Sequence, residues 1–410
     1  MRHLCILFCF TVLIGCTETP TAIGQSDWPN YRGPNRDNAV NVQGLEEALA
    51  HASERLAWRR DIGLGYTVVT TSGGRAYTVG WRDGTATVRC IDPATGEDHW
   101  TFDYEIAQFD VVPNWPKSNE GGPVTSPAIA DGRVFHSTRD GRVYCLDADD
   151  GSLIWQDSFS ERFGVEQPRW GWAASPVVID GVVYFDTGRV VAMRASDGKV
   201  LWQTEELNPT SYATVTPFSM NGRSYLAAWP LDGAMVVDRD TGKMVAFYPW
   251  DTPTPCHAAS PLVFDGDKIF VSMGFNGGGA VLRFTGEVLE AVWENNDMCN
   301  TMATSLYRDG HLYGFDQAIF RCVDAKTGEI KWSHRGLGQG SLMAVGDTML
   351  VQSEKGDLSI APLTPEGYKP GPRVTLLDTS VRVWSCPVIS NGRMYLRDPL
   401  GELVCIDVSN

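Results

Sequence analysis

Short runs of alternating apolar and polar residues cover most of the chain, and Asp-Gly or Asn-Gly pairs separate them. Ser126-Pro127 leads into one such run, Asp131-Gly132 ends it, and the next run reaches Val143-Tyr144. Alternation with a period of two predicts half-buried β-strands, and Asp-Gly between two runs predicts a hairpin because Gly tolerates positive φ. The same order returns after Ser175-Pro176, Ser260-Pro261 and Cys386-Pro387.

A second phrase, Asp-x-x-Thr-Gly, recurs along the chain and is followed in most copies by Trp. Its full form runs from Asp92 to Gly96 with Trp100. Complete, degenerate or shortened copies place their turn glycine at Gly151, Gly198, Gly242, Gly286, Gly328 and Gly367. Successive turn glycines are 55, 47, 44, 44, 42 and 39 residues apart. A period of about 40–45 residues with three turns per unit gives four strands, which is typical of a β-propeller blade.

Counting these signals gives eight units, and they begin near Gly65, Val124, Ala173, Ala213, Ala258, Thr301, Gly340 and Ser385. The eighth unit stops after its third strand. We expect Leu56 to Asp61 to supply the missing outer strand, because Trp58 stands before Gly65 as Trp100 stands before the next unit. Such a pairing of the chain ends leaves no open seam in the ring. The prediction is an all-β, eight-bladed β-propeller of four-stranded antiparallel blades, and a linear β-solenoid is the alternative.

The first residues have the features of an export signal. An apolar run from Leu4 to Ile14 follows a basic start and is too short to span a bilayer. Leu13-Ile14-Gly15-Cys16 resembles the lipobox of bacterial lipoproteins, in which the signal is cut before a Cys that carries the acyl chains. An ordinary secretory signal is the alternative. Thr17 follows Cys16, which favours the outer membrane facing the periplasm as the place of the lipid anchor.

Three segments are therefore expected: residues 1–15 as signal peptide, 16–27 as tether and 28–410 as a single propeller domain. Within the last, Glu46 to Arg55 predicts a short amphipathic helix on the side of the propeller.

Composition excludes several classes of partner and site. The chain has 34 Lys and Arg against 50 Asp and Glu, a net charge of −16, which disfavours nucleic acid as a partner. No CxxC, HExxH or Cys2His2 spacing exists, so a dedicated zinc or redox site has no support in the sequence. A pairing of Cys256 with Cys299 is conceivable in an oxidising compartment. We expect the cysteines at one position of the repeat to be buried apolar residues: Cys90, Cys145, Cys322 and Cys405.

The Asp-x-x-Thr-Gly-x-x-x-Trp phrases resemble the tryptophan-docking motifs of pyrroloquinoline quinone (PQQ)-type propellers. The resemblance covers residues 28–410 and implies that each indole packs between neighbouring blades. Trp28 to Arg36, with the sequence WPNYRGPNR, is similar to the opening of planctomycete-type PQQ-like propeller proteins. Length, lipidation and eight blades are also similar to the outer-membrane β-barrel assembly lipoprotein. The residues expected to dock blades in this way are Trp58, Trp100, Trp155, Trp202, Trp293 and Trp332.

Two classes of function compete under this resemblance. The first is a membrane-anchored, non-catalytic and monomeric scaffold that holds an envelope protein or a carbohydrate. The second is a quinoprotein dehydrogenase with PQQ and calcium in the central funnel. Such enzymes resemble this chain in their blades but usually carry two adjacent cysteines and longer insertions, and no Cys-Cys pair exists here. We therefore predict the scaffold, with no catalytic residue, no metal and no cofactor assigned.

Loops that lead into the innermost strands meet at one end of a propeller, and here they contain aromatic, amide and guanidinium groups. These groups suit a planar ligand, a sugar or a protein partner by stacking and charge-assisted hydrogen bonds. Sealing of the blade interfaces is the alternative role for the tryptophans. The candidate residues are Trp115, Lys117, Asn119, Glu120, Arg169, Trp170, Trp172, Tyr212, His257, Asn300, Gln339, Arg382 and Trp384.

Overall fold

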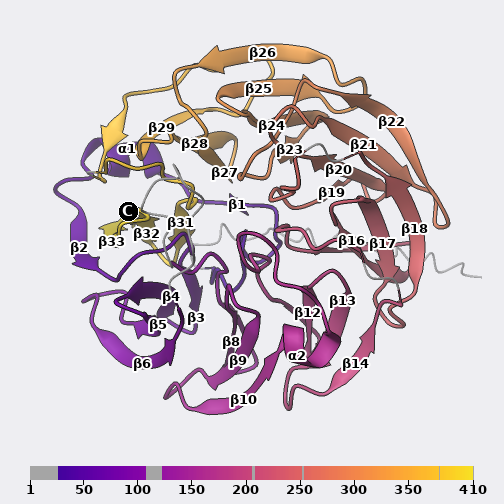
Figure 1. Cartoon of the computed structure of the whole chain (residues 1–410). Helices are drawn as coiled ribbons and strands as arrows, with labels where there is room; N and C mark the ends of the chain where they lie inside the picture. The colour runs from indigo at the N-terminus through magenta and orange to yellow at the C-terminus, as the bar shows by residue number, and fades with distance from the viewer. Residues whose placement is uncertain (1–25, 108–121, 206–207, 252–253, 378, 410) are drawn as a thin grey trace, which may run out of the picture.

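 A computed structural model describes residues 26–107, 122–205, 208–251, 254–377 and 379–409. They form eight sheets arranged as blades around a central axis, and the colour in Figure 1 passes once around the ring from indigo to yellow. The predicted eight-bladed, antiparallel β-propeller is confirmed.

Each blade runs from an innermost to an outermost strand. Blades 1 to 4 consist of β3 (Thr70–Ser72), β4 (Arg75–Arg82), β5 (Thr85–Ile91) and β6 (Asp98–Glu105); β7 (Ala128–Ala130), β8 (Arg133–Ser137), β9 (Arg142–Asp147) and β10 (Leu153–Ser158); β11 (Val177–Ile179), β12 (Val182–Asp186), β13 (Val190–Arg194) and β14 (Val200–Gln203); β15 (Thr216–Met220), β16 (Arg223–Ala228), β17 (Gly233–Asp238) and β18 (Met244–Pro249).

Blades 5 to 8 follow the same order. They consist of β19 (Leu262–Phe264), β20 (Lys268–Ser272), β21 (Gly279–Phe284) and β22 (Leu289–Asn295); β23 (Leu306–Arg308), β24 (His311–Asp316), β25 (Ile319–Asp324) and β26 (Ile330–Arg335); β27 (Ser341–Val345), β28 (Thr348–Gln352), β29 (Asp357–Pro362) and β30 (Val374–Thr375); β31 (Val388–Ser390), β32 (Arg393–Arg397) and β33 (Glu402–Asp407).

An N-terminal strand closes the ring. β2 (Leu56–Asp61) is the outermost strand of blade 8, antiparallel to β33, with Trp58 opposite Cys405 and Arg60 opposite Leu403. This pairing confirms the closure expected from the sequence. Because the first and last parts of the chain share one sheet, the ring cannot open without breaking that sheet.

The repeated tryptophans lie between neighbouring blades. The Trp58 indole N–H donates to the carbonyl of Pro93 at 2.9 Å, and that of Trp100 donates to the carbonyl of Ala148 at 3.0 Å. Trp155, Trp202, Trp293 and Trp332 donate in the same way to a carbonyl of the following blade. The turn glycine supports this contact, since a Cβ on Gly151 would lie 2.5 Å from Cε3 of Trp100.

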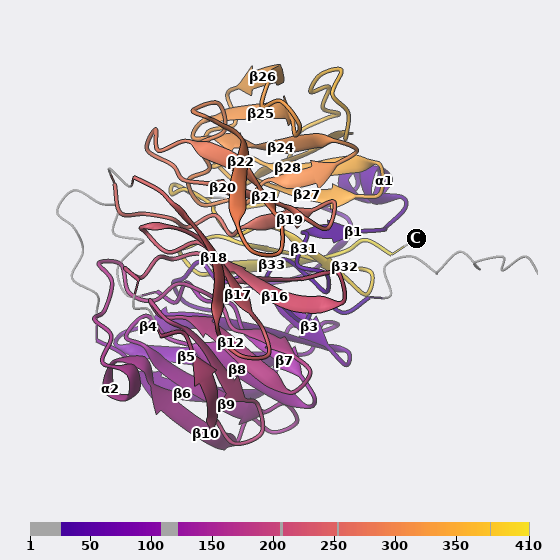
Figure 2. The same ribbon diagram turned by 90° about the vertical axis from the view of Figure 1, so that its right-hand side faces the viewer.

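Two faces of the ring differ in what they carry. The loop face holds the segments that lead into the innermost strands and the turns between second and third strands. The turn face holds the remaining hairpins, including the Asp-x-x-Thr-Gly turns. Figure 2 shows the ring from the side, with α2 (Phe159–Phe163) on the loop face and the C-terminus on the opposite side.

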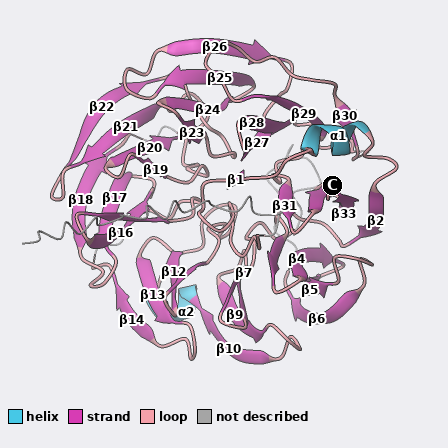
Figure 3. Ribbon diagram, turned by 180° about the vertical axis from the view of Figure 1, so that it is seen from behind, coloured by secondary structure: helices cyan, strands magenta, loops and turns pink. Residues whose placement is uncertain are grey.

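Within the described residues, two short helices accompany the strands (Figure 3). The helix predicted from Glu46 to Arg55 is present but shorter: α1 spans Leu45–Ala50, and residues 51–55 form a turn. It buries Leu45, Ala48 and Leu49 against a core to which blades 7, 8 and 1 contribute. No helix in the described stretches has the length and apolar character needed to cross a membrane.

The cysteines at the repeated position are buried, as expected: Cys90, Cys145, Cys322 and Cys405. Cys256 and Cys299 are free thiols, so the pairing considered from the sequence is not formed. They belong to the loops before different blades and have separate surroundings: Cys256 lines the central cavity, whereas the Cys299 thiol lies 3.5 Å from the carbonyl of Asn296.

Candidate functional site

Residues 27–40, which we call the plug, run across the inside of the ring. The innermost strand of each blade has one edge that faces the central axis, where its N–H and C=O groups need partners. The plug supplies some of them: the carbonyls of Trp28 and Pro29 accept from Thr71 and Ile129, in blades 1 and 2. Its last part, β1 (Ala39–Val40), pairs in parallel with β27 of blade 7 and lies near the middle of the ring in Figure 3.

The backbone of the plug turns sharply. Arg32, Arg36 and Asn38 have φ values of 66°, 59° and 56° although none of them is Gly. Gly33 has φ 88°, and a Cβ there would lie 2.9 Å from the Trp28 ring. These left-handed residues fold the segment compactly enough to fit within the ring, and side-chain bonds hold it there, such as that from Arg36 to the carbonyl of Val178 at 3.0 Å.

A chain of hydroxyl groups links neighbouring blades above the plug. The backbone N–H of Val68 donates to Ser126 Oγ, that of Ser126 to Ser175 Oγ, and that of Ser175 to Thr214 Oγ1, each at 3.0 Å. The series continues through Ser260 and ends at Thr304 in blade 6. In blade 8 the corresponding position is Cys386, which accepts from Nδ2 of the plug residue Asn38 at 3.1 Å. The plug thus takes the place of the hydroxyl series beside blades 7 and 8.

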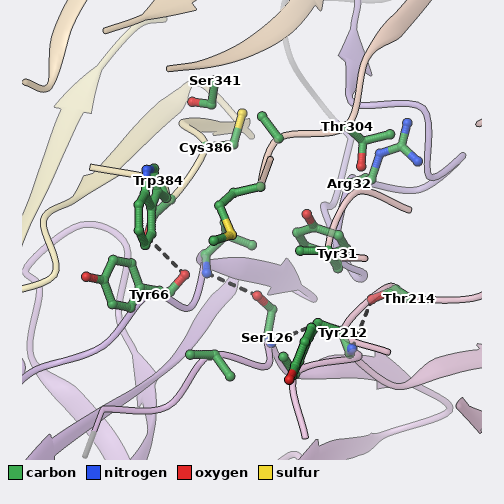
Figure 4. A pocket seen from close by; sticks show the side chains of 18 of the residues that line it. Tyr31, Arg32, Tyr66, Ser126, Tyr212, Thr214, Thr304, Ser341, Trp384 and Cys386 are labelled. Atoms are coloured by element: carbon green, nitrogen blue, oxygen red, sulfur yellow. Dashed lines mark hydrogen bonds between the residues drawn. The ribbon is translucent and has the colours of Figure 1, made fainter. Parts of the chain in front are cut away.

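A cavity of about 210 Å³ lies between the plug and the loop face. Its walls come from all eight blades, and its floor includes Trp28, Tyr31, Arg32 and Asn38 of the plug. Figure 4 shows Tyr31 and Arg32 on one side of the space, with Tyr66 and Trp384 on another and Tyr212 below. The rings of Tyr66 and Trp384 are stacked, with centroids 5.4 Å apart, and Trp170 meets Tyr212 edge to face at 5.5 Å. The cavity is therefore aromatic on several sides.

The charges along the cavity are all positive. Its lining, within the described stretches, contains two arginines, Arg32 and Arg139, and no Asp, Glu, Lys or His. Burial lowers the pKa of Arg139 to about 10, so this guanidinium remains protonated at neutral pH, and burial lowers the pKa of Arg32 as well. Burial raises the pKa of Tyr212 and of Cys256 to about 12, so these groups remain neutral. A cationic cavity thus lies within a chain whose net charge is −16.

Three residues predicted from the sequence line this cavity. They are Trp170, Tyr212 and Trp384, from the loops before blades 3, 4 and 8. Arg169 and Arg382 are exposed on the loop face; Arg169 lies over the Trp170 ring at 5.0 Å, and Arg382 pairs with Glu354 at 3.7 Å.

Gln339 is half-buried nearby, and its backbone N–H donates to Glu354 at 3.0 Å. Trp115, Lys117, Asn119, Glu120 and the expected lipidation site Cys16 lie outside the described residues.

Three other predicted residues are buried away from the cavity, which corrects their expected place at the opening. Trp172 is 1% exposed and packs edge to face on Phe159. His257 is fully buried and stacks on Trp229 with ring centroids 4.2 Å apart. Asn300 is 1% exposed, and its side chain donates to the carbonyl of Phe315 and accepts from Ser305. Packing and hydrogen bonding within the fold account for all three.

Sequence reasoning missed the floor of the cavity. The sequence predicts no position in the fold for Trp28 to Arg36, because the resemblance of this segment to the opening of a family does not place it in the ring. A signal did exist in the sequence, because two prolines, a glycine, two aromatic residues and two arginines in nine positions fit neither a strand nor a hairpin.

Comparison with known proteins identifies the family. A family profile described as "Outer membrane protein assembly factor BamB" matches residues 84–334, more than half of the chain. The chain belongs to this family. BamB of Escherichia coli (strain K12) is 36% identical over 88 residues, which are 19% of this chain and 21% of that protein. BamB of Moranella endobia (strain PCIT) is 25% identical over 314 residues, 72% of this chain and 78% of that protein.

An enzyme is also among the relatives of this BamB-family chain. Tetrathionate hydrolase of Acidithiobacillus ferrooxidans is 25% identical over 244 residues, which are 57% of this chain and 42% of that protein. The chain thus matches less than half of the length of both the Escherichia coli protein and the hydrolase.

Solved structures share the fold at low identity. BamB of Moraxella catarrhalis has a TM-score of 0.61 at 14% identity, covering 85% of this chain and 96% of that one. Quinohemoprotein alcohol dehydrogenase of Comamonas testosteroni has a TM-score of 0.65 at 16% identity, covering 94% of this chain and 81% of that one. Assembly factors and dehydrogenases therefore have the same architecture, and the fold alone does not separate the two functions.

Proposed function

We propose that this protein is a non-catalytic scaffold of the bacterial cell envelope, anchored to the outer membrane by a lipid on Cys16 and facing the periplasm. The observation that carries the proposal is the match of residues 84–334 to the outer membrane assembly factor family. Its partner on this proposal is another protein of outer membrane assembly, bound by the loop face.

The position of the N-terminal segment supports this orientation. Asp27 accepts from the backbone N–H of Gly73 at 2.9 Å and from the side chain of Asn391 at 2.8 Å, and both partners are hairpin residues of the turn face. A lipid on Cys16 would therefore connect to the propeller from the turn face. The ten residues from Thr17 to Ser26 reach at most about 35 Å. The loop face, with Arg169 and Arg382, then points away from the membrane.

Site-specific photo-crosslinking in the native host tests the proposal. A photoreactive amino acid at Arg169 or Arg382 is expected to capture proteins of outer membrane assembly. The same amino acid at Lys326, an exposed position in an Asp-x-x-Thr-Gly turn on the opposite face, is the matched control and is expected to capture none of them. The proposal would be contradicted if both faces captured the same proteins equally. It would also be contradicted if the loop-face positions captured no envelope protein.

A substitution at Trp170 separates a binding role from a packing role. Trp170 is half-buried, between Arg169 and Tyr212. Trp170→Ala is expected to weaken the crosslinks from Arg382 while the protein still unfolds cooperatively. If Trp170→Ala instead prevents folding, this indole belongs to the core and not to the binding face.

A quinoprotein dehydrogenase is the second candidate, because solved dehydrogenases share the fold. Calcium beside a quinone takes hard oxygen ligands, above all carboxylates. The described lining of the cavity has no Asp or Glu, and the described residues contain no cluster of three or more His, Cys, Asp or Glu that could hold a metal. These residues do not fit the calcium-bound quinone. Addition of PQQ with calcium, followed by absorbance of the bound quinone, tests this directly, and stoichiometric uptake would favour the dehydrogenase.

A further inference from the structure

Three buried oxygen atoms of blades 3 and 4 have no hydrogen-bond partner in the described parts of the chain. They are Oδ2 of Asp186, Oδ1 of Asn208 and Oδ1 of Asp232. The Asp186 side chain belongs to the interior, at 4% exposure. An ionised carboxylate and an amide oxygen can only accept hydrogen bonds. Buried acceptors that lack a donor are costly, so these three oxygens call for an explanation.

One turn brings the three side chains together on the loop face, between two neighbouring blades (Figure 1). Asp186 ends β12, and its Oδ1 accepts from the backbone N–H of Gly188 at 3.0 Å. The carbonyl of Gly188 accepts from the backbone N–H of Asn208 at 2.8 Å. The Asn208 side chain then donates through Nδ2 to Oδ2 of Asp232 at 2.8 Å. These bonds use one oxygen of each carboxyl group, so the other oxygens, with that of the amide, form one cluster around the turn.

The fold gives this cluster a second negative group where another blade has a cation. Among the described residues, the charged group that acts on the Asp186 carboxyl is Asp232, which has the same sign. Arg189 lies near in the sequence, but its guanidinium donates to two backbone carbonyls of the segment after β14. In blade 6, Asp316 ends β24 as Asp186 ends β12, and it pairs with Arg321 at 3.1 Å. Blade 3 therefore lacks the positive charge that blade 6 supplies.

Two carboxylates and an amide oxygen are ligands that a hard divalent cation prefers. A water molecule has two hydrogens for three acceptors, and it leaves two negative charges side by side. A calcium ion lies about 2.3–2.6 Å from its oxygen ligands, nearer than a water molecule does, so atoms closed to water can still bind it. Magnesium keeps several of its waters and demands near-ideal octahedral geometry, which disfavours it at such closed oxygens.

We propose that Asp186, Asn208 and Asp232 form a calcium site that joins blade 3 to blade 4 on the loop face. Backbone carbonyls and waters supply the remaining ligands. Asn208 precedes the cavity residue Tyr212 by four positions, so a bound calcium holds a segment of the loop face in place. The proposal does not depend on the scaffold function, since a calcium ion between two blades can accompany any role of the propeller.

Calcium and a proton compete for the same carboxyl group. Without the cation, burial and Asp232 keep Asp186 protonated up to a pKa of about 7. Calcium binding displaces this proton, because the ligand must be ionised. The pH dependence of stability that Asp186 produces therefore belongs to the chelator-treated protein.

Calorimetric titration of the full-chain protein in detergent, treated with a chelator that is then removed, tests the proposal with two probes. Calcium chloride is expected to bind saturably, one ion per chain, with a dissociation constant of at most about 1 mM. Magnesium chloride is expected to bind at least about tenfold more weakly. Absence of saturable calcium binding in this range would overturn the proposal. Equal affinities for the two ions would refute calcium as the ion that the site selects.

Variants locate the site. Asp186→Asn and Asp232→Asn each keep an oxygen but remove one negative charge, and each is expected to lower calcium affinity at least about tenfold. Asp180→Asn is the matched control, since it removes an exposed carboxylate from the other end of blade 3, and it is expected to keep calcium affinity.

Full calcium affinity in either folded site variant would refute the placement, and so would an equal loss in Asp180→Asn. If a site variant does not fold, a crystal structure of the wild type grown with calcium decides. Calcium bound to Asp186 and Asp232 supports the placement, whereas calcium bound only elsewhere refutes it.

Discussion

Asp186 gives a pH dependence of stability that one substitution should remove. It ends β12, is 4% exposed, and accepts from the backbone N–H of Gly188 at 3.0 Å through Oδ1. Its Oδ2 is buried without a hydrogen-bond partner. Burial, together with the nearby Asp232, raises the pKa of Asp186 to about 7, although the hydrogen bond from Gly188 acts to lower it. The native state therefore favours the neutral acid at this position.

The sign and size follow from the difference between the two states. The unfolded chain releases the Asp186 proton near pH 4, whereas the native protein keeps it until about pH 7. In this window the native state binds more protons, so stability falls as pH rises and the whole loss is present above pH 7. The native pKa lies about two pH units above pH 5. Over this interval the wild-type protein loses about 3 kcal/mol of its free energy of unfolding.

Asp186→Asn keeps an oxygen for the Gly188 N–H and cannot ionise. The free energy of unfolding of the variant, measured relative to the wild type, should therefore rise by about 3 kcal/mol between pH 5 and pH 8. Urea unfolding at several pH values, followed by tryptophan fluorescence, measures this difference. Because other ionisable groups are common to both proteins, their contributions cancel in the comparison.

Asp180→Asn, in the hairpin at the other end of the same blade, is the control. The Asp180 side chain is 77% exposed, and its partner is the surface residue Arg239 at 3.1 Å. Its effect should be small and nearly constant over the same pH range. A constant difference between wild type and Asp186→Asn, or one that grows toward low pH, would refute the reasoning.

Two further substitutions test how the blades are joined. Gly151→Ala should lower the free energy of unfolding by about 2–4 kcal/mol, because it combines φ 75° with a Cβ only 2.5 Å from Trp100. Gly132→Ala is the control, since Gly132 has φ 69° but no atom within 4 Å of its Cβ position, and it should cost about 1–2 kcal/mol. Equal urea midpoints for the two would contradict this. Trp58→Phe removes the indole N–H donated to Pro93 and should cost about 1–3 kcal/mol by the same assay, so an unchanged midpoint would show that this bond is dispensable.

The repeat made the architecture predictable from the sequence. Each Asp-x-x-Thr-Gly turn is specified within a few residues: Asp324 accepts from the backbone N–H groups of Lys326 and Thr327, and Gly328 has φ 75°. Because such local signals recur at the period of a blade, they fix the number of blades and the order of strands. The closing strand was predictable for the same reason, since Trp58 repeats the position of Trp100.

The hydroxyl series was only partly visible in the sequence. The Ser-Pro pairs mark the start of innermost strands, and Ser126 and Ser175 are members of them. Their role, however, is a bond between blades, from the N–H of Ser126 to Ser175 across 49 residues of chain. Only the curvature of the ring brings these positions together, so a pattern read along one blade cannot show it.

The candidate site depended most on tertiary structure. Trp170 and Trp172 are two residues apart, yet Trp170 lines the cavity and Trp172 is packed against Phe159, because Gly171 between them has φ 74° and turns the chain. The sequence alone determined the blades, their number and their closure, since local turns repeated eight times leave one solution. Tertiary structure alone decided that the plug lies inside the ring and places Arg32 on the cavity, because its partners are strand edges in distant blades that no local pattern specifies.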